Sequence, residues 1–302
     1  MTLITVLASL VLDHVLYAHR DSRVGLLFGR AVDAVASRLP ASWNGVGGAI
    51  VVIAGPVVVM LLVQWLLAGL LFGLVSLVVA VVVLLFSLGP LDIANHVEDY
   101  VDARRTDDRE RTAWYFERVT GEVPPEAPQD EGRRMVEAIL YQGHDHLFAT
   151  VFWFCLLGPT GAVLYRMAAE SALRPPASIV NRPELNRSLR YVAGVLGWIP
   201  SRLIAFGYAM TGSFEEALRR LRGRFQTAED LLSANRQLLI DTGTAALRQE
   251  ENADTAAGAN ASDERRSTDP ADVVDSARAL AVRTAVLWLA VLALLTLAGW
   301  FS

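Results

Sequence analysis

A dense run of polar side chains lies beside a long apolar stretch near the middle of the chain. It reads EAILYQGHDH from Glu137 to His146 and includes the amide of Gln142. If this segment is helical, four of its side chains share one face because they are separated by 4, 3 and 1 residues. These four are Glu137, Tyr141, His144 and Asp145. Such a face could bind a polar ligand at the end of a membrane helix.

The His144-Asp145-His146 run could also ligate a metal, since imidazole and carboxylate groups are common ligands. Successive residues of a helix point about 100° apart, however, and a spacing of the HExxH type is absent. The alternative is a polar cap at the membrane interface that satisfies the end of the next helix. The spacing favours the cap, so no metal site is predicted.

Two arginines, Arg166 and Arg202, lie at the ends of further apolar runs. Arg202 follows Pro200 by two residues in an otherwise apolar stretch, where a charge is unfavourable unless it is paired or faces water. It is either a side chain that reaches the interface or a site residue that pairs with Glu137 or Asp145. The candidate ligand-binding residues are therefore Glu137, Tyr141, Gln142, His144, Asp145, His146, Arg166 and Arg202, and no catalytic residue is assigned.

The composition excludes several classes of protein. All 27 basic residues are arginine, so the lysine that a P-loop or a protein kinase requires is absent. The single cysteine, Cys155, excludes an intrachain disulfide and a cysteine-rich zinc site. The net charge of −5 argues against nucleic acid as the main partner.

The elements that must position these residues are membrane helices. Residues 39–91 contain no charged side chain, and a stretch of that length is sufficient for two spans of about 20 residues. The sequence predicts an all-α polytopic membrane protein with five or six transmembrane or re-entrant helices. The expected spans of the membrane domain, 1–213, are about 1–17, 48–65, 66–88, 147–169 and 191–213, and a last span covers 281–302.

The segments between the spans are polar. Residues 92–146 form a charged extramembrane segment, with a proline-rich loop, TGEVPPEAPQDEG, at 120–132. Residues 214–250 are expected as amphipathic helices and 251–276 as a flexible linker. Gly158-Pro159 interrupts the run at 147–169 and predicts a break or a re-entrant turn there.

Arginine placement predicts the orientation. With six spans, the polar loops 19–46, 92–146 and 214–283 lie on one side and hold 21 arginines, whereas the opposite loop, 166–190, holds five. The positive-inside rule therefore places the three large loops in the cytoplasm, and membrane lipid is an expected partner.

Two stretches resemble a known family. VEAILYQGHDHLFATVFWFCLLGPTGAVLYRMAAES at 136–171 and LGWIPSRLIAFGYAMTGSFEEAL at 196–218 are similar to AmpE, a membrane protein associated with β-lactamase induction. AmpE is in turn similar to the CobD/CbiB cobalamin-biosynthesis family. Ten positions match the motifs of the cobalamin proteins: Val136, Glu137, Asp145, Phe152, Trp153, Tyr165, Trp198, Ile199, Pro200 and Arg202.

The resemblance implies a regulator in the bacterial inner membrane that is linked to cell-wall recycling. Its implied partner is an AmpD-like cytosolic amidase or a muropeptide, and a homodimer remains open. The cobalamin ligase activity is not expected, because an asparagine and an aspartate of that family fall on Ala169 and Ala172. Those replacements remove oxygen atoms of the kind that bind Mg²⁺, so no cofactor is expected, and ATP with Mg²⁺ is implied by the resemblance alone.

Two other functions stay open at this point. One is a membrane-bound ligase or transferase with a different substrate, in which Glu137 and Asp145 bind a metal or act as bases. The other is a transporter, since helices interrupted by Gly-Pro with embedded polar groups also line permeation paths. The few spans and the absence of an internal repeat in the sequence argue against transport.

The orientation can be tested with reporter fusions. Fusions at Ser22, Asp130 and Asn260 should all report a cytoplasmic position, because the three loops that contain them carry most of the arginines. Alkaline phosphatase and fluorescent-protein fusions read the two sides independently. A periplasmic signal at Asp130 would reverse the predicted orientation.

Overall fold

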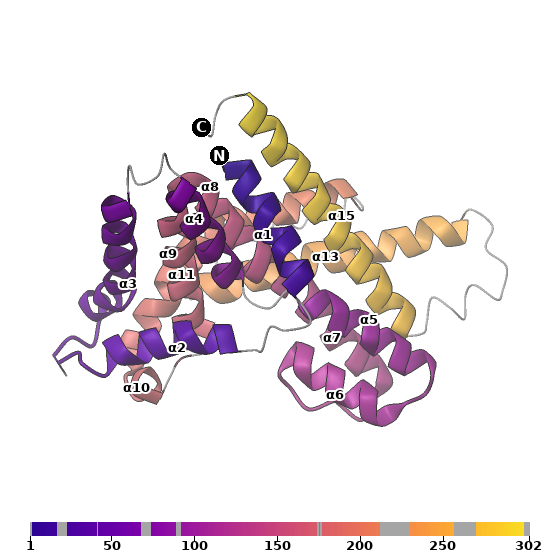
Figure 1. The fold of residues 1–302 in the computed structure, drawn as a ribbon. Coiled ribbons are helices and arrows are strands. Elements are labelled where there is room, and N and C mark those ends of the chain that lie inside the picture. Colours follow the sequence, from indigo (N-terminus) through magenta and orange to yellow (C-terminus); the bar gives the residue numbers. More distant parts are fainter. Residues whose placement is uncertain are drawn as a thin grey trace.

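The chain folds as a set of helices (Figure 1). The computed structural model describes residues 2–16, 23–40, 42–67, 74–88, 92–173, 175, 177–211, 230–256 and 270–298. Within these ranges no strand occurs, so the predicted all-α class is confirmed. The α-helices are α1 (Thr2–Leu16), α2 (Arg23–Ala36), α3 (Val46–Leu67), α4 (Leu74–Leu88), α5 (Asp92–Arg105), α6 (Arg109–Thr120), α7 (Pro128–Gln142), α8 (Ala149–Leu157), α9 (Pro159–Leu173), α10 (Ala177–Val180), α11 (Pro183–Thr211), α13 (Leu231–Ala256) and α15 (Pro270–Leu297).

Three of these helices are long and apolar enough to cross a membrane: Val46–Leu67, Pro183–Thr211 and Pro270–Thr296. They contain or overlap the predicted spans 48–65, 191–213 and 281–302. Helices α1 and α4, with 15 residues each, lie within the predicted spans 1–17 and 66–88. Residues 17–22 and 68–73 lie outside the described part of the chain.

The apolar run at 147–169 is a helical hairpin instead of one straight span. Gly158 has φ +65°, a conformation that favours glycine, and Pro159 begins the next helix, where its missing N–H is not needed. The two helices pack closely, because a Cβ atom on Gly161 would lie 2.0 Å from the carbonyl oxygen of Trp153. At the tip, the Thr160 hydroxyl donates to Gln64 of α3. The break predicted at this dipeptide is confirmed.

Helices α5, α6 and α7 form a compact extramembrane unit. Asp108 accepts a hydrogen bond from the N–H of Arg111 at the start of α6, and Gly121 ends that helix with φ +74°. Buried Glu131 accepts hydrogen bonds from the Tyr100 hydroxyl at 2.7 Å and from Arg104 at 3.1 Å. The expected loop at 120–132 ends earlier, because α7 begins at Pro128.

Helix α15 joins this unit to the membrane. It begins at Pro270, so the linker expected at 251–276 is too long, and α13 continues to Ala256. Buried residues recur every three positions along its polar half and pack with α5 and α7 in one core: Ala271, Val274, Ala277 and Leu280. This apolar stripe was not evident in the sequence, because acidic and arginine residues lie between its members.

Ion pairs fix the polar half of α15 to α5. Arg105 lies 2.9 Å from Asp272, and Arg278 lies 2.8 Å from Glu98. The hydrogen bond to Asp272 raises the pKa of Arg105 above its ordinary value. Pro270 also touches α7 at Gly132. The same helix therefore anchors the extramembrane unit and continues as a membrane span (Figure 1).

The close contact between α11 and α15 predicts that one methyl group added at Gly207 destabilises the protein. A Cβ atom on Gly207 would lie 2.6 Å from Thr284 and 2.7 Å from the indole nitrogen of Trp288. Gly207→Ala should therefore displace α15 and lower the free energy of unfolding by about 1–3 kcal/mol. Thermal unfolding in detergent measures this change.

The matched control is Gly29→Ala in α2, where the added Cβ meets nothing within 4 Å. That change should leave the unfolding temperature unchanged or raise it, because alanine is the better helix former. Equal destabilisation by both variants would contradict the close packing of α11 on α15.

Candidate functional site

The polar run singled out in the sequence lies on a π-helix, η3 (Gly143–Phe148), which connects α7 to α8. A π-helix bonds each residue to the fifth along the chain, so the register of α7 is not continued beyond Gln142. The shared face expected for Glu137, Tyr141, His144 and Asp145 stays a prediction, because it extends across this junction. The side chains of residues 144–146 lie outside the described part of the structure. Short π-helical segments occur frequently at functional sites.

The last two turns of α7 hold the other three residues of the run. Glu137 lies 3.8 Å from Arg133 on the same helix. Tyr141 is buried, and the guanidinium of Arg236 in α13 lies 5.2 Å from the centre of its ring. The Gln142 amide donates a hydrogen bond to the carbonyl of Val119, which ties the end of α7 to the end of α6.

The most deeply buried charges belong to Arg166 and Glu170 of α9. Their side chains are only 1% and 7% exposed and lie 3.3 Å apart. Tyr165 of the same helix packs in a buried cluster with Ala149 and Ala169. A charged pair at this position is stable only while both partners are present, because removal of one leaves an uncompensated buried charge.

Arg202 lies half-buried between α11 and α13. Its guanidinium donates to the Trp198 carbonyl at 2.9 Å and to the Asn235 side chain at 3.2 Å. It also stacks on the Trp198 ring at 3.9 Å. Asn235 in turn donates to the Gly194 carbonyl at 2.8 Å. Glu137, one of the two carboxylates expected to pair with Arg202, instead faces Arg133.

The start of α13 supplies residues that the sequence analysis missed. Asp230 accepts a hydrogen bond from the Leu232 N–H, so it is the N-cap of α13, and its acidic side chain before an apolar run was the available signal. Arg190 of α11 pairs with Asp230. Burial alone raises the pKa of Asp230, but hydrogen bonds from Arg190 and Ser233 outweigh it and hold the pKa below its ordinary value.

These residues form one connected region. The Trp153 indole of α8 donates to the Leu196 carbonyl of α11 at 3.0 Å, which joins the hairpin to the helix that carries Arg202. Helix α11 also contacts η3, α9 and α13. Helix α11 therefore links the helix with the buried Arg166–Glu170 pair, the π-helix and the Arg202–Asn235 pair. Guanidinium and amide groups in this arrangement suit a ligand that carries carboxylates or other hydrogen-bond acceptors.

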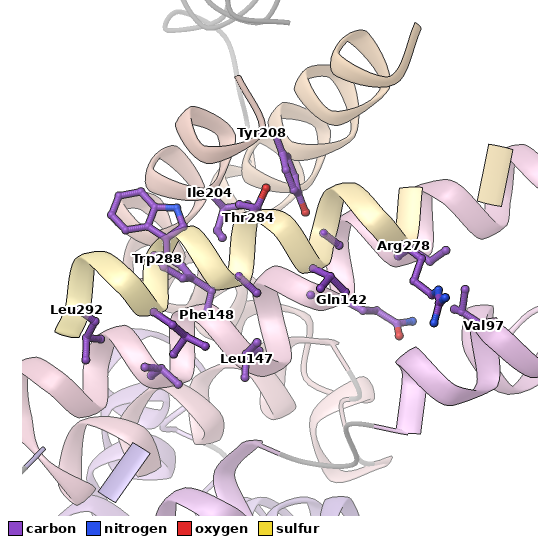
Figure 2. Close-up of a pocket in the computed structure, with 17 residues that line it drawn as sticks. Val97, Gln142, Leu147, Phe148, Ile204, Tyr208, Arg278, Thr284, Trp288 and Leu292 are labelled. Atoms are coloured by element: carbon purple, nitrogen blue, oxygen red, sulfur yellow. The ribbon is translucent and has the colours of Figure 1, made fainter. Parts of the chain in front are cut away.

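An apolar cavity of about 160 Å³ is lined by residues of η3, α11 and α15 (Figure 2). Leu147 and Phe148 of η3 line it together with Thr284 and Trp288 of α15, and the ring centres of Phe148 and Trp288 lie 5.3 Å apart. The Tyr208 hydroxyl at its edge donates to the Leu140 carbonyl at 2.9 Å. Sequence analysis did not predict this cavity, because its walls come from helices far apart in the chain.

Fold and site together define a helical membrane protein in which polar residues gather where a broken hairpin meets an extramembrane unit. The chain matches the family model described as "Regulatory signalling modulator protein AmpE" over residues 1–301. It therefore belongs to the AmpE family, as the sequence resemblance predicted.

Two curated relatives carry the name cobalamin biosynthesis protein CobD. The protein of Chromobacterium violaceum is 32% identical over 176 residues, which cover 55% of this chain and 53% of that protein. The protein of Stutzerimonas stutzeri is 27% identical over 226 residues, which cover 72% of each chain. The chain thus spans about half of the first relative and nearly three-quarters of the second. No solved structure matches.

The buried ion pair predicts that replacing one partner lowers the stability more than replacing both. Arg166→Met should lower the free energy of unfolding by about 3–5 kcal/mol, because Glu170 would remain buried with its main cation removed. The double variant Arg166→Met/Glu170→Leu should be less destabilised than the single variant. Chemical unfolding in detergent measures both.

Arg187→Met is the matched control, since Arg187 pairs with Glu184 within one helix but both side chains are exposed. It should change the stability by less than about 1 kcal/mol. A double variant that is less stable than Arg166→Met would contradict the mutual dependence of the two charges.

Proposed function

We propose that this protein is a membrane-embedded regulator that links the state of cell-wall recycling to β-lactamase induction. The observation that carries the proposal is the match to the AmpE family over essentially the whole chain. In this account the protein resides in the bacterial inner membrane with its large loops in the cytoplasm. An AmpD-like amidase or a muropeptide is the expected partner.

The site geometry supports recognition of a ligand with carboxylates. The half-buried guanidinium of Arg202 is held between α11 and α13 by the buried side chain of Asn235, and Arg236 follows at the exposed surface of α13. Muropeptides carry carboxylates, and an arginine can bind a carboxylate through two parallel hydrogen bonds. Binding here would act on α11, which contacts both the hairpin and α15.

A membrane ligase or transferase is the second candidate, because the curated relatives are named for cobalamin biosynthesis. The positions that carry asparagine and aspartate in that family's motif are Ala169 and Ala172 here. Both alanines are buried, with 3% and 2% of their surface exposed. Buried methyl groups in place of oxygen ligands weaken the case for nucleotide-linked Mg²⁺ chemistry at α9.

An induction assay in the native host tests the regulatory role. Deletion of the gene should change the ratio of induced to basal β-lactamase activity by about fivefold or more, the lower range of typical coupling between two sites. Wild-type protein and the control Arg187→Ala should restore the ratio, whereas Arg202→Ala should not. Immunoblots of membrane fractions verify equal amounts of the variants.

An unchanged induction ratio after deletion would contradict the regulatory proposal. Thermal shift of the detergent-solubilised protein with ATP and Mg²⁺ separates the two candidates. The regulator should show no saturable shift from the nucleotide. A saturable shift that Asp145→Ala abolishes would instead support the ligase.

A further inference from the structure

The apolar cavity beside η3 has the shape of a channel along α15. Its lining on that helix extends from Arg278 to Leu292, a distance of about 21 Å at 1.5 Å per residue. Figure 2 shows Leu147 and Phe148 on one side of α15 and Ile204 and Tyr208 on the other. The cavity is therefore elongated along the helix that crosses the membrane.

The side chains that line the cavity favour an apolar ligand. Arg278 pairs with Glu98, and the indole N–H of Trp288 is a buried donor at the cavity without a hydrogen-bond partner. Three other polar side chains there have partners within the protein. Tyr208 donates to the Leu140 carbonyl, Gln142 donates to the Val119 carbonyl, and Thr284 shares a hydrogen bond with Thr211 at 3.0 Å. The remaining surface is formed mainly by leucine, valine, alanine and aromatic side chains. A guest gains little here from hydrogen bonds and much from contact with hydrocarbon.

The position of the cavity determines where such a guest comes from. Only 11% of the membrane-spanning window of α15 is buried inside the protein, so most of this helix faces the surrounding bilayer. Val282 lines the cavity and is 51% exposed, which places a rim of the cavity on the surface that faces lipid. Bilayer acyl chains are the apolar molecules present at that rim.

Charge at one end of the cavity marks the level of the lipid headgroups. The apolar run of α15 begins after Arg283, which is exposed next to Val282. Arginines at the end of a membrane span lie at the height of the lipid phosphates. A chain that enters beside Val282 and extends towards Leu292 therefore has its phosphate near Arg283.

We propose that the cavity holds one acyl chain of a bilayer phospholipid, inserted between α15 and the η3–α8 and α11 helices. The bound chain contacts Leu147 and Phe148, the last residues of the π-helix that carries the candidate polar site. It therefore fills the space between α15 and η3. This proposal is independent of the regulatory function.

The test is native mass spectrometry of the full-length protein after reconstitution into vesicles of phosphatidylethanolamine and phosphatidylglycerol and extraction into mild detergent. Wild-type protein should retain one phospholipid per chain. Ala285→Trp should abolish this retention, because Ala285 lines the cavity and the indole would occupy it. Ala290→Trp is the control on the exposed face of the same helix and should retain the lipid.

A photoreactive acyl phosphatidylglycerol in the same vesicles gives a second readout that needs only the wild-type protein. Label should appear on Phe148, Val151 and Ile204, which line the cavity behind α15. Labelling confined to exposed residues such as Val286 would overturn the proposal. So would retention of the phospholipid by Ala285→Trp, or retention of an isoprenoid in place of a phospholipid by the wild type.

Discussion

The structure depends on the requirement that two opposite charges stay together inside an apolar hairpin. Arg166 and Glu170 lie one turn apart on α9 with almost no exposed surface, and neither can be buried alone without a large penalty. Their burial requires cover from every side. Helix α8 folds back on α9 at Gly158, and α2, α3, α4 and α11 pack around the same helix. The hairpin is thus the centre around which the membrane helices assemble.

A series of contacts also connects the polar site with the extramembrane unit. Helix α11 carries Arg202, and five residues further along the same helix Gly207 packs against the side chains of Thr284 and Trp288 from α15. Helix α15 then continues to α5 through the pairs Arg105–Asp272 and Arg278–Glu98. Packed side chains and ion pairs therefore connect α11 with α5 through α15.

The sequence predicted the class of fold, the break at Gly158-Pro159 and the longest spans, because these follow from hydropathy and from the backbone properties of glycine and proline. It also drew attention to Arg166 and Arg202, since charges within apolar runs are conspicuous. It did not predict Asn235 or Asp230 as partners, because those contacts depend on how α13 packs along α11. The π-helical register of residues 143–148 was likewise unpredictable from α-helical spacing.

The most direct test of this account is an experimental structure in lipid nanodiscs by electron cryo-microscopy. The account predicts that the chain reverses at Gly158, that the two limbs of the hairpin pack together, and that Arg166 and Glu170 form a pair inside the protein. The contradicting result would be one continuous helix through residues 149–173 with the Arg166 side chain at the lipid headgroups. In that case the buried pair and the polar region built around it would not exist.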